Sequence, residues 1–245
     1  MKKGFTLIEL LGVIIILLVI FIITIPAVNK VIRDSEETIY DTQTNRILNA
    51  TYDYSLKNLS ILPDKYQKNY VTLAELIHNG YIDLIVNPNT NKPFPQDYLI
   101  SIENVGSKYR NNYKYAKKNG DYLYKIEFEL MESENYNNNK PTLSLVDDGG
   151  VEISTKVDDY KYVSTIEKDS PFIDAHLVVK DSSDNVITDA RKTENIIFND
   201  TLVEDVDTSK VGIYKINYVV LSKDSANNYY AAILTWEVVI TDEND

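Results

Sequence analysis

The first residue of this chain with a possible functional role is an acidic residue at the start of a long apolar stretch. Glu9 stands directly before residues 10–23, none of which has a polar side chain. A carboxylate at the centre of a lipid bilayer costs about 2.5–3.5 kcal/mol and costs less near the bilayer edge, so Glu9 needs a cationic partner there. Lys2 or Lys3 could supply that cation by extending along the helix, which is the simplest structural role for the pair.

The apolar run itself is long enough to cross a bilayer. About 20 apolar residues span a membrane as a helix, so we expect a transmembrane segment over about residues 7–28. Lys2 and Lys3 precede it, which predicts a cytoplasmic N-terminus and places the rest of the chain outside the cell. A secretory signal peptide has a shorter apolar core followed by a cleavage site with small residues. The run here is longer, and Ile25-Pro26-Ala27 is only a faint candidate for such a site. A plain single-pass anchor would explain the length and the lysines, but not Glu9.

The residues around Glu9 form a recognisable pattern. Residues 3–10 read Lys-Gly-Phe-Thr-Leu-Ile-Glu-Leu, which resembles the prepilin signature of type IV pilins and pseudopilins. In that family a short basic leader ends in glycine, a phenylalanine begins the mature chain, and a glutamate follows four residues later. The resemblance covers residues 2 to about 30, including Pro26. It implies cleavage between Gly4 and Phe5 by a prepilin peptidase, and N-methylation of Phe5.

The same resemblance implies an assembly role for Glu9. Removal of residues 1–4 takes away both lysines and frees the amine of Phe5, about one helical turn from Glu9. In a fibre, Glu9 would meet the Phe5 amine of a neighbouring subunit. Because an unpaired buried charge is heavily penalised, such a pair would set the axial register. Glycine at position 4 would let the peptidase approach the scissile bond closely.

Beyond the apolar run, an amphipathic helical pattern continues. Apolar residues recur at spacings of three, four, seven and eight from Ile32 to Leu59, which predicts a single apolar stripe on a polar helix. Pro63 ends the pattern. We therefore expect one helix over residues 5–62. Pro26 should kink it, since proline removes one i→i−4 hydrogen bond.

Residues 63–134 are expected to form a small αβ head of the pilin type, followed by a polar linker over residues 135–141. Thr72 and Glu75 fit a capping box at the start of a short helix that Gly80 ends. The expected strands are residues 81–86, 98–103, 113–117 and 122–130. This part of the chain also resembles a recurring stretch of Gram-positive pseudopilins. The matching residues are Thr72-Leu-Ala-Glu-Leu, Gly80-Tyr81-Ile82 and Asn87-Pro88.

Residues 142–245 alternate short strands with turns, which predicts an antiparallel β-sandwich. The expected strands are residues 142–146, 173–179, 186–188, 195–198, 213–222 and 230–240. The region resembles bacterial immunoglobulin-like surface modules. The residues that carry this resemblance are Val206-Asp207, residues 211–218, and residues 224–227, which precede a last strand. Ala226 departs from that pattern, because glycine is common there. The predicted fold class is α+β: a long N-terminal transmembrane and assembly helix, a small αβ pilin head, and an Ig-like sandwich.

Composition excludes several functions. The net charge of −12 argues against a surface that binds nucleic-acid phosphates. His78 and His176 have no histidine or cysteine partner at metal-ligand spacing, and no nucleophile elbow, P-loop or dinucleotide motif is present. We expect no catalytic residues, no cofactor and no metal. The acidic turns at residues 147–150 and 181–185 could hold Ca²⁺, although turn formation is the commoner role of such residues.

The sequence therefore predicts a structural subunit of a type IV pilus-like or pseudopilus fibre in a Gram-positive bacterium. Its expected partners are other pilin subunits, the prepilin peptidase, the pilus assembly machinery and the membrane. We expect it at the cell membrane before assembly and on the cell surface afterwards, and the size of the extracellular part favours a minor subunit. The alternatives are a membrane-anchored adhesin whose Ig-like part is functional, an anchored enzyme, and a component of a DNA-uptake machine.

Overall fold

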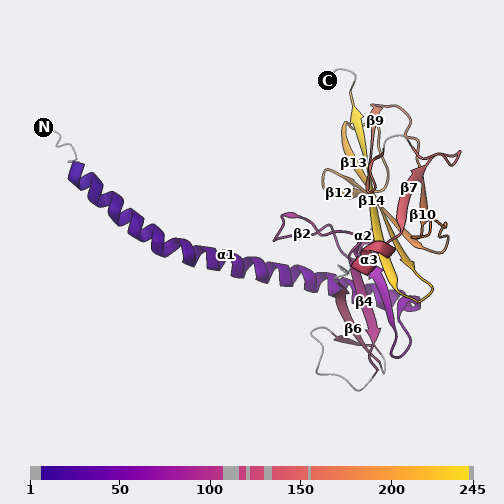
Figure 1. Cartoon of the computed structure of the whole chain (residues 1–245), viewed down its shortest axis with the longest axis horizontal. Coiled ribbons are helices and arrows are strands. Elements are labelled where there is room, and N and C mark those ends of the chain that lie inside the picture. Colours follow the sequence, from indigo (N-terminus) through magenta and orange to yellow (C-terminus); the bar gives the residue numbers. More distant parts are fainter. Residues whose placement is uncertain (1–6, 107–115, 120–121, 130–133, 154–155, 243–245) are drawn as a thin grey trace. The chain divides into compact units, whose positions relative to one another are not determined.

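The computed structural model describes residues 7–106, 116–119, 122–129, 134–153 and 156–242 (Figure 1). The chain divides into two units. The first consists of Met1–Asn45 with Asn87–Lys92, and the second of Arg46–Val86 with Pro93–Asp245. The positions 63, 135 and 142, at which domain boundaries were predicted, all fall inside the second unit, and the predicted division stays a prediction.

The helix α1 runs from Leu7 to Lys57 and is 51 residues long, which corresponds to about 75 Å. It continues unbroken through position 26, so a kink at Pro26 stays a prediction. The hydroxyl of Thr24 donates to the carbonyl oxygen of Ile20 at 2.9 Å, and Thr38 and Thr42 make equivalent bonds one turn back. Such bonds bend helices slightly, and α1 curves along its length in Figure 1.

The expected transmembrane segment over about residues 7–28 is not found. Among the residues that the structure describes, no helix qualifies by length and hydropathy as a candidate membrane span.

The first part of the second unit is a four-stranded antiparallel sheet with strand order β1-β4-β6-β5. The strands are β1 (Lys68–Thr72), β4 (Leu99–Asn104), β6 (Tyr122–Glu129) and β5 (Ala116–Asn119). The 3-10 helix η1 (Leu59–Ile61) precedes the sheet, and β2 (Val86–Asn87) pairs with β3 (Lys92–Pro93). Part of the predicted strand 113–117, residues 113–115, lies outside the described residues.

The predicted capping box is confirmed at the helix α2 (Leu73–His78). The Thr72 hydroxyl accepts the Glu75 backbone N–H at 3.2 Å, and the Glu75 carboxylate accepts the Thr72 backbone N–H at 2.9 Å. The helix stops where predicted, because Gly80 adopts a φ of 70° that a residue with a Cβ rarely takes.

The second part is a six-stranded sheet with strand order β12-β11-β13-β14-β9-β8, beside a two-stranded sheet of β7 and β10. The strands are β7 (Thr142–Val146), β8 (Lys156–Asp158), β9 (Lys161–Glu167), β10 (His176–Lys180), β11 (Arg191–Phe198), β12 (Thr201–Val203), β13 (Gly212–Lys223) and β14 (Tyr229–Thr241). The long β13–β14 hairpin lies at the centre of the large sheet. The predicted strands 213–222 and 230–240 are therefore confirmed.

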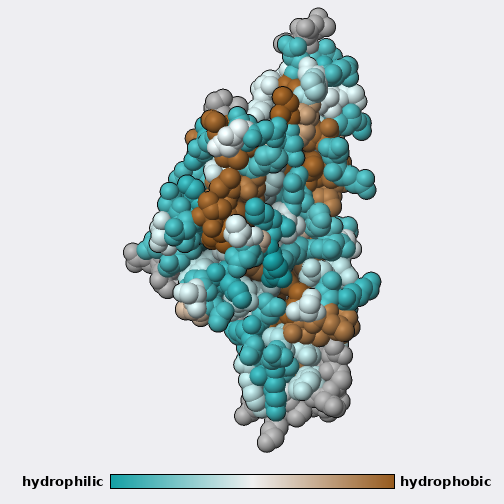
Figure 2. Space-filling model, turned by 90° about the vertical axis from the view of Figure 1, so that its right-hand side faces the viewer, coloured by the Kyte–Doolittle hydropathy of each residue, from teal (hydrophilic) through white to brown (hydrophobic). Residues whose placement is uncertain are grey.

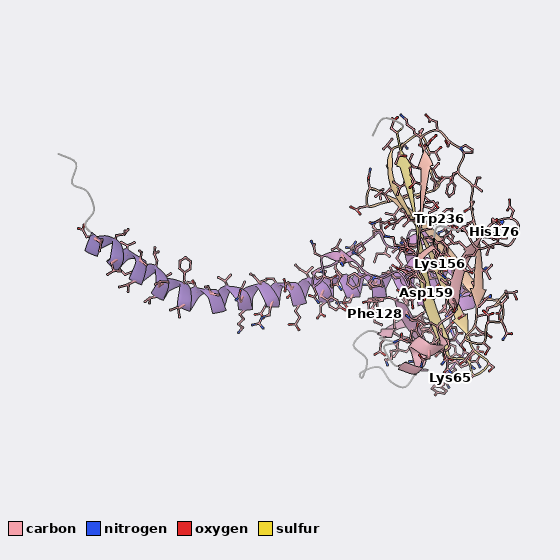
Figure 3. All side chains as sticks on the ribbon, turned by 45° about the horizontal axis from the view of Figure 1, so that its top comes forward. Lys65, Phe128, Lys156, Asp159, His176 and Trp236 are labelled. Carbon is pink, nitrogen blue, oxygen red and sulfur yellow. The ribbon has the colours of Figure 1, made fainter. Side chains whose placement is uncertain are left out.

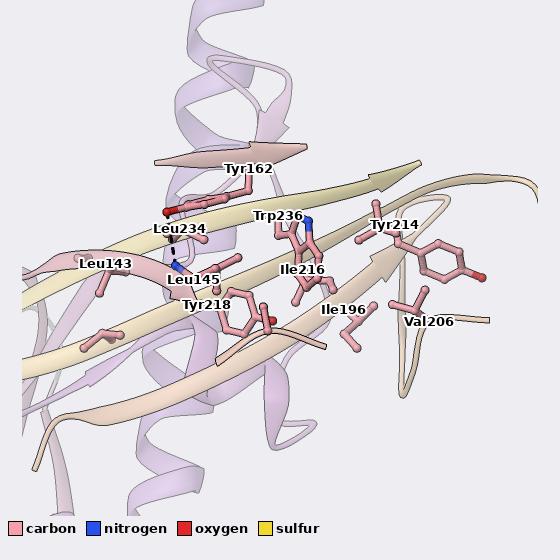
Figure 4. Close-up of a cluster of buried hydrophobic side chains, with 14 of the residues drawn as sticks. Leu143, Leu145, Tyr162, Ile196, Val206, Tyr214, Ile216, Tyr218, Leu234 and Trp236 are labelled. Atoms are coloured by element: carbon pink, nitrogen blue, oxygen red, sulfur yellow. Dashed lines mark hydrogen bonds between the residues drawn. The ribbon is translucent and has the colours of Figure 1, made fainter. Parts of the chain in front are cut away.

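The main hydrophobic core lies on one face of the large sheet (Figure 4). Tyr162 and Tyr214 are among the largest fully buried side chains. The Tyr162 hydroxyl accepts the Leu145 backbone N–H at 3.4 Å. The indole N–H of Trp236 donates to the Ser164 hydroxyl at 2.9 Å. The polar tips of these buried aromatic side chains are thus hydrogen-bonded, as burial requires.

The other face of β13 and β14 is also covered at one end. Leu221, Tyr230 and Ala231 pack with Leu99 of β4 and Tyr136 of the helix α3 (Glu134–Asn139) in a second hydrophobic cluster. The predicted linker over residues 135–141 thus contains a helix, and Tyr136 is only 7% exposed. The two sheets share one packed interface.

The predicted fold class is wrong. Among the described residues, strands predominate at 38% against 29% helix, and they form several sheets rather than a pilin-like head with a separate sandwich. β14 pairs in parallel with β9, so the large sheet is mixed and not antiparallel. The physical reason is that local alternation predicts strands but does not determine which strands pair. Parallel pairing joins residues 161–167 to residues 235–241, far apart in the chain.

Candidate functional site

The predicted site residues are only partly within the described structure. Gly4 and Phe5 lie outside the described residues. Glu9 is exposed in the first turn of α1, where a negative charge is stabilised by the helix dipole by about 0.3–1 kcal/mol. Pro26 lies in the same helix, about 25 Å further along its axis. The structure thus places Glu9 at a helix end and does not bring it together with Pro26.

A continuous apolar surface follows Glu9. Every residue from Val13 to Phe21 has a large apolar side chain that is 45–61% exposed, and Leu10 and Leu11 are exposed to a similar extent. Nine successive residues turn through more than two helical turns, so apolar side chains face every direction around the axis. Figure 3 shows side chains on all sides of this part of the ribbon. We call residues 10–22 the apolar segment.

The apolar segment differs from an ordinary amphipathic helix. A helix that is hydrophobic all round is normally buried. Completing the burial of the half-exposed side chains would contribute on the order of 10 kcal/mol, at about 1 kcal/mol for each. Contiguous apolar patches of this size mark surfaces that bind other apolar surfaces. The segment is therefore a continuous exposed apolar surface, and it begins at the residue after Glu9.

The surface of the second unit is mainly hydrophilic, unlike that of the apolar segment. On the face in Figure 2, hydrophilic residues predominate, and the hydrophobic side chains form separate patches. Exposed Val151, Val157 and Ile173 belong to this unit. Exposed apolar residues in small numbers are normal on a protein surface.

Polar contacts join the two sheets of the second unit. Arg191 of β11 pairs with Glu75 of α2, with 3.4 Å between Nε and Oε1. The Asn195 side-chain amide donates to the Gln96 side-chain oxygen at 2.9 Å, and His78 Nδ1 lies 2.9 Å from the Glu194 carbonyl oxygen. Burial raises the pKa of Glu75, and the nearby Arg191 guanidinium opposes that rise. Sequence analysis missed this junction, because Asn195 follows four polar residues of β11 and so gave no signal that its side chain is buried.

The acidic turns are shaped by hydrogen bonds of their own. Asp147, Asp181 and Asp224 each accept two backbone N–H groups through Oδ1, two and four residues further along the chain, at 2.8–2.9 Å. The backbone N–H of Asn185 lowers the pKa of Asp181, and the side-chain amide of Asn228, together with its backbone N–H, lowers the pKa of Asp224. Within the described residues, no group of three His, Asp or Glu residues could hold a metal ion.

The turn at Ala226, where glycine is usual, forms without one. The residue with positive φ is Asn227, at 62°, and asparagine tolerates this conformation. The Asp224 backbone N–H donates to the Asn228 carbonyl oxygen at 3.0 Å and closes the loop. The departure from the Ig-like pattern therefore does not prevent the β13–β14 hairpin.

Comparison with protein-family models finds no match, and comparison with the curated proteins finds none either. Similarity to known proteins therefore assigns no family to this chain, and function must be inferred from the residues themselves.

Proposed function

We propose that this chain is a type IV pilin-like structural subunit that is cleaved between Gly4 and Phe5 and polymerises through α1 into a surface fibre. The observation that carries this proposal is the placement of the apolar segment directly after Glu9, in the first turns of one long helix. The proposal rests on the N-terminal residues alone. It makes no use of the fold of the second unit.

Copies of the same helix are the partners that best fit this surface. The apolar segment has no polar face, so a bundle of parallel copies can bury it from all directions. Glu9 then enters the bundle and requires a cation at the same depth, because an unpaired buried charge is strongly destabilising. The free amine of Phe5 in a neighbouring copy supplies that cation after cleavage.

The partners in this proposal are the prepilin peptidase, the pilus assembly machinery, other pilin subunits, and the membrane in which the subunit is held before assembly. The chain acts as a structural protein and catalyses no reaction. The second unit, Arg46–Val86 with Pro93–Asp245, is displayed on the fibre surface. Its acidic character is consistent with the chain's net charge of −12 and favours solubility.

The test is incorporation of a Glu9→Ala variant into fibres. We expect the variant to be made and cleaved normally, but to be at least about tenfold depleted in sheared surface fibres relative to the wild-type chain. Glu37→Ala is the matched control, because Glu37 is an exposed acid on the same helix outside the apolar segment. Equal incorporation of the Glu9→Ala and wild-type chains would contradict the proposed role of Glu9.

A further inference from the structure

A polar cavity of about 400 Å³ opens in the second unit, where α3 meets the turns around it. Asp97 comes from the turn before β4, Asn137 from α3, and Lys140 from the residues after α3. Tyr160 comes from the turn between β8 and β9, and Ser182 from the loop after β10. The volume is in the range of small-molecule sites in proteins, which is about 300–1,000 Å³. These elements are far apart in sequence, so the folded unit is needed to form the cavity.

The charged groups at the cavity are held in place. The Asp97 side chain is 17% exposed, and its carboxylate lies 4.0 Å from the ammonium of Lys140. That ammonium also lies 5.2 Å from the centre of the Tyr136 ring, which is buried in the second hydrophobic cluster. A carboxylate that accepts and an ammonium that donates are therefore fixed side by side.

Tyr160 offers an exposed aromatic ring on a rigid backbone. The residue is 66% exposed. Its backbone N–H donates to Asp158 Oδ1 at 2.8 Å, and its carbonyl oxygen accepts the Thr235 backbone N–H of β14 at 2.8 Å. A ring held in this way can pack against a ligand at a low cost in conformational entropy.

The residues that line the cavity indicate which class of ligand it can bind. The carboxylates of Asp97 and Asp159 are balanced by the ammonium groups of Lys140, 4.0 Å from Asp97, and Lys156, 3.5 Å from Asp159 (Figure 3), so the site has no excess of positive charge. Such a site does not favour phosphates or other anions. The amides of Asn137 and Asn138 make it too polar for an apolar ligand. The ligand that fits is uncharged and has hydroxyl groups that both donate and accept hydrogen bonds.

We propose that this cavity binds a neutral sugar residue of a glycan. The Tyr160 ring packs on the C–H face of the sugar, while Asp97 accepts hydrogen bonds from sugar hydroxyls and Lys140 donates to them. Asn137, Asn138 and Ser182 complete the polar contacts. This site is independent of the apolar segment, so its failure would leave the fibre proposal unaffected.

The experiment uses the full chain purified in detergent. Binding of free glucose, galactose, mannose and N-acetylglucosamine is measured by saturation-transfer NMR, and binding to immobilised neutral glycans is measured on an array. At least one neutral sugar should bind. Tyr160→Ala and Asp97→Asn should each weaken that binding about tenfold or more, while Tyr66→Ala should not. Tyr66 is a fair control because it is 63% exposed and does not line the cavity.

Three outcomes would overturn the assignment. The first is absence of binding to every neutral sugar tested. The second is equal binding by the wild-type chain, Tyr160→Ala and Asp97→Asn. The third is a clear preference for sialylated or sulfated glycans, because a site without excess positive charge predicts the opposite order. Circular dichroism of each variant distinguishes loss of the site from loss of the fold.

Discussion

Arg191 of β11 and Glu75 of α2 form an ion pair across the two sheets of the second unit, with Nε 3.4 Å from Oε1. Arg191 also donates to the carbonyl oxygen of Tyr70. Glu75 is 9% exposed in its side chain, and its other carboxylate oxygen closes the capping box with Thr72. One carboxylate thus begins a helix and joins two sheets that are distant in sequence.

We expect Arg191→Met to lower the free energy of unfolding by about 1–3 kcal/mol. Removing one partner of a fully buried ion pair costs about 3–5 kcal/mol, and Arg191 is partly exposed, so its cost should be smaller. Urea unfolding of the full chain measures this change. Lys161→Met is the matched control, since Lys161 pairs with Glu237 at 2.8 Å within one sheet and its side chain is 39% exposed. A surface pair of that kind contributes about 0–1 kcal/mol, and equal losses in the two variants would contradict the prediction.

The pH dependence of stability should change in Glu75→Gln. Burial raises the pKa of Glu75 in the folded chain above its ordinary value of 4.5. The folded state then holds a proton that the unfolded state has released, so this residue makes stability fall as pH rises above about 4.5. Glu75→Gln should lack that fall. Unfolding measured between pH 4 and pH 8 should show the wild-type chain losing stability relative to the variant, and a constant difference would contradict this.

Tyr136→Phe tests whether α3 belongs to the folded core. The Tyr136 hydroxyl accepts the Ala231 backbone N–H at 2.9 Å, at the end of β14 that β9 does not cover. Phenylalanine would remove the acceptor of a buried N–H, which costs about 1–3 kcal/mol. Tyr122→Phe should leave stability unchanged, because Tyr122 is 44% exposed. If both variants unfold at the same urea concentration as the wild-type chain, α3 acts only as a linker.

Gly212→Ala should destabilise the end of the long hairpin. Gly212 has a φ of 146°, and a Cβ there would lie 2.7 Å from a carbon of the Phe198 ring. That ring is stacked on Tyr214 with 4.4 Å between centroids, so it has little room to move. We expect a loss of about 1–3 kcal/mol. In a double-mutant cycle, the loss should shrink when Phe198→Ala is also present, and strict additivity of the two changes would contradict the contact.

Local features were predictable from the sequence, and pairings between distant segments were not. The capping box of Thr72 and Glu75 depends on residues three positions apart, so the sequence contains all the information needed. The burial of β13 on both faces also had a signal, since Tyr218 to Leu221 is an apolar run without alternation. The helix α3 had none, because its asparagine-rich sequence has low helix propensity. Tertiary packing of Tyr136 accounts for it.

The two candidate sites also differ in how well the sequence alone predicts them. The apolar segment and its position after Glu9 could be predicted from the sequence, because residues that are consecutive in the sequence stay neighbours along a helix. The cavity that Asp97, Lys140 and Tyr160 help to line could not be predicted, since five separate chain segments form it. Its residues are ordinary polar residues in turns, and only the folded second unit makes them neighbours.

The most direct measurement of the central claim is the mass of the N-terminal peptide of the protein recovered from surface fibres of its native host. Cleavage and methylation predict a chain that begins at Phe5 with one added methyl group. A Gly4→Leu variant should keep residues 1–4 and remain outside the fibres. A wild-type protein that still begins at Met1, or one that is never recovered in fibres, would contradict the account.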